Sequence, residues 1–93
     1  MQLHWLERAG ISADDSSDWK ILWQLTRHLD VLGETYERVT AARDGIPFDD
    51  RLETVPHAEK ALRADLDKLD KLVTAARVTF DPDAYRQSRG VSP

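Results

Sequence analysis

Apolar residues recur at alternating spacings of three and four within residues 18–43, which is the pattern of one face of a long α-helix. The repeating positions are Leu22, Leu25, Leu29, Leu32, Tyr36 and Val39. We expect an N-cap within residues 15–17 (Asp-Ser-Ser) and a stop at Asp44-Gly45, since glycine readily takes the left-handed conformation that ends helices. At a rise of about 1.5 Å per residue, this helix is predicted to be roughly 40 Å long.

We call such a row of apolar positions along one helix face a seam. A second seam follows an acidic turn at residues 44–54. Its positions are Val55, Leu62, Leu66, Leu69, Val73, Ala76 and Phe80, and Glu59 interrupts it. Thr54 is the predicted N-cap, and Pro56 is tolerated in a first turn because that N–H lacks an intrahelical partner anyway. The pattern predicts a second long helix that ends at residues 81–83 (Asp-Pro-Asp), with one more short turn reaching Tyr85.

The two seams match each other when the second helix runs antiparallel to the first. Facing residue numbers then have a constant sum over six layers: Leu22 with Ala76, Leu25 with Val73, Leu29 with Leu69, Leu32 with Leu66, Tyr36 with Leu62 and Val39 with Glu59. This agreement predicts a helical hairpin with coiled-coil-like packing.

The segments outside the hairpin carry weaker patterns. Residues 2–9 predict a short helix that ends at a left-handed Gly10, after which Ile11 folds back on Leu6. No segment alternates as a strand does, so we expect an all-α fold with essentially no sheet. Residues 1–85 are predicted to form a single helical domain and residues 86–93 a flexible C-terminal tail.

Two helices that share one seam cannot enclose a core, and several apolar residues lie off the seam. These are Trp19, Ile21, Trp23, Val31, Ala61, Leu72, Ala75 and Val78. Fully burying a large apolar side chain contributes about 1.5–3 kcal/mol, so an uncovered set is costly. The N-terminal segment, through Leu3, Trp5, Leu6 and Ile11, can cover part. A second copy or a different protein can cover the rest, and we expect a homodimer that completes a four-helix bundle.

Trp19 and Trp23 lie one turn apart on the first long helix, with Arg27 one turn further on. Tryptophan and arginine are the residues that dominate interface hot spots, and a cation beside an indole adds a cation–π attraction. Burial of both indoles under the N-terminal segment is the alternative interpretation. The predicted protein interface comprises Trp19, Trp23, Arg27, Ile21, Val31 and Leu72.

Glu59 occupies a seam position near the turn, one layer from Arg43 on the other helix. We predict an ion pair between them that helps to set the register of the hairpin. A catalytic role for Glu59 is the alternative interpretation.

Composition narrows the classes of function. The chain has 13 Lys and Arg against 17 Asp and Glu, a net charge of −4, and no cysteine. These values disfavour nucleic-acid binding and exclude disulfides, thiolate zinc sites and cysteine nucleophiles. His4, His28 and His57 share no ligand spacing, so no metal or other cofactor is expected. We expect a cytoplasmic protein that does not enter the membrane, because no stretch approaches about 20 apolar residues and the N-terminus is polar.

The function that these patterns favour is a non-enzymatic protein-interaction or regulatory module acting through a helical hairpin surface. Two alternatives remain open. One is a small inhibitor from a genetic conflict, such as a phage anti-defence protein or an antitoxin that occludes its partner. The other is an accessory subunit of an enzyme.

Overall fold

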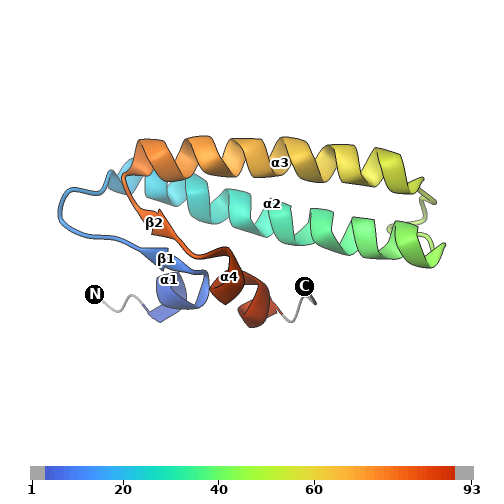
Figure 1. Cartoon of the computed structure of the whole chain (residues 1–93), viewed down its shortest axis with the longest axis horizontal. Helices are drawn as coiled ribbons and strands as arrows, with labels where there is room; N and C mark the ends of the chain where they lie inside the picture. Colours follow the sequence, from blue (N-terminus) through green and yellow to red (C-terminus); the bar gives the residue numbers. More distant parts are fainter. Residues whose placement is uncertain (1–3, 90–93) are drawn as a thin grey trace.

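The computed structural model describes residues 4–89, with the side chains of His4 and Trp5 outside the description. Within this range the elements are α1 (His4–Arg8), β1 (Ile11–Ser12), α2 (Trp19–Asp44), α3 (Val55–Ala76), β2 (Thr79–Phe80) and α4 (Pro82–Arg89). The long helices α2 and α3 pack as an antiparallel hairpin, and the four short elements lie along one side of it (Figure 1). The predicted hairpin with a short N-terminal helix is confirmed, while the four-helix bundle of a dimer stays a prediction.

The N-cap of α2 is one residue later than expected. The Asp18 carboxylate accepts hydrogen bonds from the backbone N–H groups of the first turn. The residues before it form a turn of their own, in which Asp14 accepts from the Ser16 N–H at 2.8 Å and the Ser17 N–H donates to the Asp14 carbonyl. The prediction of a cap within residues 15–17 is therefore wrong, because this local turn already holds that segment.

The other helix ends at the hairpin turn follow the sequence prediction. Gly45 ends α2 in the left-handed conformation, with φ at 69°. At the start of α3, the Thr54 hydroxyl accepts from the His57 N–H at 3.3 Å, and Pro56 lies in the first turn. These caps are local signals, which explains why they were readable in the sequence.

Contacts at both ends of the hairpin report its register. At one end the Asp18 N–H donates to the Ala76 carbonyl at 2.8 Å, and at the other Arg43 meets Glu59 at 3.2 Å. The Arg43–Glu59 contact joins adjacent layers, as predicted, and the Ala76 carbonyl meets Asp18, one turn before the Leu22 that was predicted to face it. The predicted register agrees with the structure to within one helical turn.

The second helix is shorter than its apolar seam suggested. It ends at Ala76, and Arg77 takes the left-handed conformation with φ at 57°, so the prediction that the helix continues through Phe80 is wrong. The Arg77 Nε donates to the Ser16 carbonyl at 2.7 Å, and the Ser17 hydroxyl donates to the Arg77 carbonyl. The turn before α2 therefore holds the end of α3 and redirects the chain.

A two-stranded antiparallel sheet joins the two ends of the chain, with Ile11 opposite Phe80. The Asp81 N–H donates to the Gly10 carbonyl at 2.7 Å. Gly10 is left-handed as predicted, with φ at 80°, and a Cβ there would lie 2.3 Å from the Asp81 carbonyl oxygen. The all-α prediction holds for the fold as a whole, but this short sheet was not predicted, because strands of two residues are too short to show alternation.

The predicted C-terminal tail is partly helical. The Asp81 carboxylate caps α4 by accepting from two backbone N–H groups of its first turn. The helix continues past Tyr85, so residues 86–89, expected to belong to a flexible tail, are helical. Residues 90–93 lie outside the described part of the chain.

The core lies where the short elements pack against the hairpin. Its buried members are Leu6, Ile11, Leu22, Leu25, Leu29, Leu32, Leu69 and Tyr85. Leu6 and Ile11 confirm that the N-terminal segment covers part of the hairpin, whereas Leu3 lies outside the described residues. The Tyr85 hydroxyl donates to the Leu29 carbonyl at 2.9 Å, so α4 supplies cover that the sequence analysis did not anticipate.

Candidate functional site

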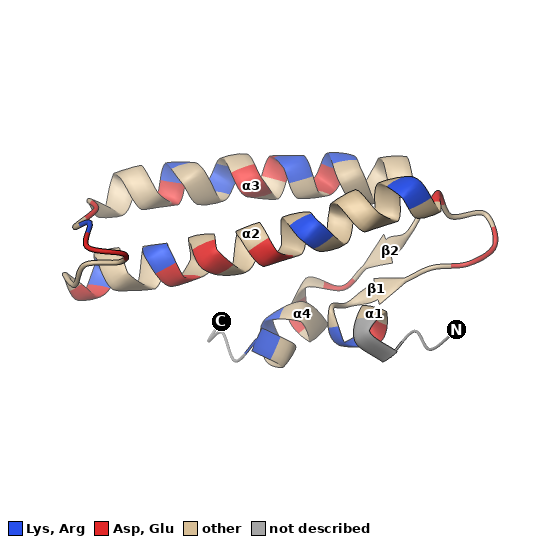
Figure 2. Cartoon of the chain, turned by 180° about the vertical axis from the view of Figure 1, so that it is seen from behind, with Lys and Arg blue, Asp and Glu red and all other residues tan. Residues whose placement is uncertain are grey.

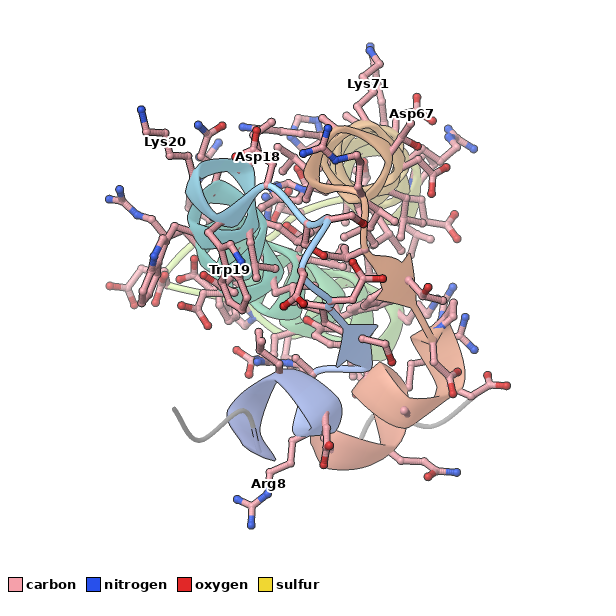
Figure 3. All side chains as sticks on the ribbon, turned by 90° about the vertical axis from the view of Figure 1, so that its left-hand side faces the viewer. Arg8, Asp18, Trp19, Lys20, Asp67 and Lys71 are labelled. Atoms are coloured by element: carbon pink, nitrogen blue, oxygen red, sulfur yellow. The ribbon has the colours of Figure 1, made fainter. Side chains whose placement is uncertain are left out.

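The two tryptophans of α2 remain accessible to solvent. Trp19 is 40% exposed and Trp23 is 64% exposed, although α1 packs near the start of the same helix. Figure 3 shows Trp19 on the side of α2 on which α1 lies. Of the two interpretations drawn from sequence, burial of both indoles is therefore not what the described residues show.

The remaining residues of the predicted interface do not form one surface. Arg27 and Val31 are exposed, Val31 by 48%, whereas Ile21 is half-buried. Leu72 is half-buried and packs against the main core. The predicted set is thus divided between an exposed stretch of α2 and side chains that contribute to the fold.

A groove of about 690 Å³ lies where α2 meets α1 and α4. We call it the tryptophan–arginine groove; it is lined by Arg8, Ala9, Trp23, Thr26, Arg27, Leu29, Asp30, Tyr85, Ser88 and Arg89. Trp23 and Arg27 thus lie side by side on one surface, as the sequence predicted. Arg8, Tyr85 and Arg89 were not predicted to lie here, because only the tertiary structure brings α1 and α4 to α2.

The groove is a locally positive region on an acidic protein. Three arginines line it against one carboxylate, Asp30, while the whole chain carries a net charge of −4. Cationic positions on α1, on α4 and on the neighbouring stretch of α2 appear on the same side of the molecule (Figure 2). Within residues 4–89 neither Arg8 nor Arg27 makes a hydrogen bond or an ion pair, so their donors are available to a bound carboxylate.

Arg89 is held more firmly than the other two arginines. Its guanidinium lies 5.9 Å from the centre of the Tyr85 ring and 4.0 Å from the Glu37 carboxylate. It passes over Gly33, where an added Cβ would come within 2.1 Å of the guanidinium carbon. A glycine inside a helix costs about 1 kcal/mol relative to alanine, so Gly33 was the one sequence signal of this close approach.

Tyr85 forms the floor of the groove and belongs to the core. It is 4% exposed, and burial raises the pKa of its hydroxyl to about 12. The hydroxyl is engaged with the Leu29 carbonyl, so it acts as a structural hydrogen-bond donor.

Two ion pairs outside the groove join α2 to α3 or to the segment just before it. The predicted ion pair of Arg43 with Glu59 is present, but both side chains are well exposed, so its contribution to stability is small. A second pair was not predicted from the sequence: Arg38 donates two hydrogen bonds of 2.7 Å to the Glu53 carboxylate. This pairing raises the pKa of Arg38 and lowers that of Glu53.

The buried histidine also serves the hairpin. His28 is 5% exposed, and its Nε2 donates to the Asp65 carbonyl at 2.7 Å. The Thr35 hydroxyl donates to the Asp65 carboxylate, which ties the same two helices together. Within residues 4–89 no group of three or more His, Asp and Glu side chains is placed to hold a metal ion.

Comparison of the chain with protein-family models, with curated proteins and with solved structures found no match. None of the helices in residues 4–89 has the length and apolar character that crossing a bilayer requires.

Proposed function

We propose that this chain is a non-enzymatic protein-interaction module that binds protein through the tryptophan–arginine groove and the adjoining Trp19. The observation that carries the proposal is Trp23, an indole 64% exposed at the wall of a groove that also presents three arginines. Exposed tryptophan beside arginine is the composition of an interface hot spot, in which a few such residues supply most of the binding energy.

The hydrogen bonds of the buried polar side chains indicate that these groups hold the fold together. Among the described residues, every buried side-chain nitrogen or oxygen has a hydrogen-bond partner. His28, Thr35 and Tyr85 are each engaged in contacts that join helices. These groups are therefore committed to the fold, and the proposal rests on the exposed side chains of the groove. A regulator, an inhibitor or an accessory subunit would use the same surface, and the identity of the bound protein distinguishes them.

Affinity capture with matched variants tests the proposal. Immobilised native chain is compared with Trp23→Ala and Arg27→Glu in extracts of the native source, and bound proteins are quantified by mass spectrometry. Removing a hot-spot residue typically costs 2 kcal/mol or more, so we expect each variant to lower the captured amount at least about tenfold.

Lys71→Glu is the matched control because Lys71 of α3 points away from α1 and α4 (Figure 3). It should capture as much as the native chain, and circular dichroism should show all variants equally helical. Equal capture by native chain and by Trp23→Ala would contradict the proposal.

A further inference from the structure

The turn between α2 and α3 has a tip that combines acidic and apolar side chains with one exposed arginine, Arg51. The backbones of Phe48 and Arg51 exchange two hydrogen bonds of 2.9 and 3.0 Å, so Asp49 and Asp50 form the two central residues of a tight turn. Both aspartates have positive φ, at 48° and 63°, as the two central residues of a type I′ turn do. The tip, which we define as residues 46–52, therefore presents its two carboxylates at the end of the molecule.

The tip also exposes large apolar side chains. Ile46 is 53% exposed and Leu52 is 69% exposed. Within residues 4–89 the carboxylates of Asp49 and Asp50 make no hydrogen bond or ion pair. Acidic positions at this turn stand out at the end of the hairpin remote from α1 (Figure 2).

The groove offers the complementary chemistry. Arg8 and Arg27 present unpaired guanidinium groups, and the indole of Trp23 gives an apolar wall. A groove of about 690 Å³ is in the range of pockets, about 300–1000 Å³, that accommodate compact ligands. Paired carboxylates beside an exposed leucine match paired arginines beside an indole in both charge and polarity.

We propose that the tryptophan–arginine groove of one copy binds the acidic tip of a second copy. This inference rests on the proposed function and names the occupant of the groove. The tip cannot reach the groove of its own chain, since the two are separated by roughly 30 Å along the rigid α2, at about 1.5 Å per residue. In a two-fold pair each groove receives the tip of the other copy, which closes the assembly with two identical contacts.

Charge reversal on each side of the contact tests the inference. Arg8→Glu with Arg27→Glu reverses the groove, Asp49→Lys with Asp50→Lys reverses the tip, and the combination of all four restores the native net charge. Masses are measured by light scattering and sedimentation over a tenfold range of micromolar concentration. We expect the native chain to exceed its monomer mass of 10.6 kDa as concentration rises.

Each single-sided reversal should raise the dissociation constant at least about tenfold, and the combined variant should recover association. Lys68→Glu with Lys71→Glu, two exposed positions of α3, changes the net charge as much as the groove reversal and should leave association unchanged. Because the positive φ angles at the tip disfavour lysine, Asp49→Asn with Asp50→Asn serves as a second tip variant, since asparagine tolerates this conformation. It should weaken association while circular dichroism stays native.

Three outcomes would overturn the inference: a native chain that stays at 10.6 kDa throughout, association that resists both reversals, or no recovery in the combined variant. If the native chain is a monomer but still captures another protein through Trp23, the occupant is wrong and the proposed function stands. If Trp23-dependent capture fails as well, the proposed function fails with it.

Discussion

The two ends of the hairpin are packed very differently. At the sheet end, α1, β1, β2 and α4 add a second layer, and large side chains such as Leu6, Leu25 and Tyr85 are buried. At the turn end, the buried cluster consists of Val39, Ala42 and Ala58 alone, with partly buried neighbours. Two helices bury small residues between them, but large ones become buried only where further elements cover them.

Within residues 4–89, no second layer covers the hairpin at its turn end, and this region instead has a solvent-accessible groove and an ion pair. A second groove of about 790 Å³ lies between the last turn of α4, through Arg86 and Arg89, and the hairpin turn, through Ile46 and Phe48. The bidentate pair of Arg38 with Glu53 joins α2 to the segment before α3. We therefore expect the sheet end to be the more stable part of the molecule, while the turn end presents exposed side chains.

The largest difference between the two ends is expected from truncating their leucines. Leu25→Ala removes a side chain with no exposed surface and should lower the free energy of unfolding by about 2–5 kcal/mol. Leu52→Ala, at the exposed tip, should change it by less than about 0.5 kcal/mol. Urea unfolding followed by circular dichroism measures both. Similar losses at the two positions would mean that the second layer does not add the stability assigned to it.

Alkaline pH should weaken the sheet end through Tyr85. Burial raises its folded-state pKa to about 12, whereas the unfolded chain releases this proton near pH 10. The unfolded state thus binds fewer protons than the folded state between these values, so stability falls as pH rises from about 10 to 12. The loss should be about 2–3 kcal/mol, at 1.36 kcal/mol per pKa unit.

Tyr85→Phe is the control for that pH profile. It should cost about 1 kcal/mol at neutral pH, because the hydrogen bond to the Leu29 carbonyl is lost. It should also remove this part of the alkaline loss, so that the variant becomes more stable than the native chain near pH 12. Parallel profiles for the two proteins would contradict a role for Tyr85 in the alkaline transition.

The smallest expected effect comes from acid at the turn end. Hydrogen bonds from Arg38 hold the pKa of Glu53 below its usual value of 4.5. Stability from this pair is therefore present above that value and is lost as pH falls through the lower folded-state pKa. Glu53→Gln should lower the urea midpoint at pH 7 and have little effect at about pH 3. An equal effect at both pH values would show that the pairing does not depend on the charge of Glu53.

Much of the hairpin was predictable because its signals are local or periodic. The seams of α2 and α3 follow helical spacing. Gly45 and Thr54 end and begin helices through contacts with their own turns, and Glu59 pairs with Arg43 one layer away, as predicted. Local competition explains the wrong N-cap of α2, because Asp14 already holds Ser16 and Ser17 in a turn of their own.

The candidate site was only half predictable. Trp23 and Arg27 share a helix face, so their spacing in the sequence already brought them together. Arg8 and Arg89 reach the same groove from opposite ends of the chain, and no sequence spacing relates them. Arg89 also lies in a segment that was expected to be a flexible tail, so no fixed position beside α2 was predicted for it.

The sequence by itself determined the two long helices and their pairing, because periodic apolar positions specify both a helix and the face it buries. It also determined that part of this hairpin needs cover. Only the tertiary structure decided what provides the cover: Gly10 accepts a hydrogen bond from Asp81, β1 pairs with β2, and Tyr85 reaches Leu29. These contacts join segments far apart in the chain through backbone groups and single side chains, which leave no periodic trace in the sequence.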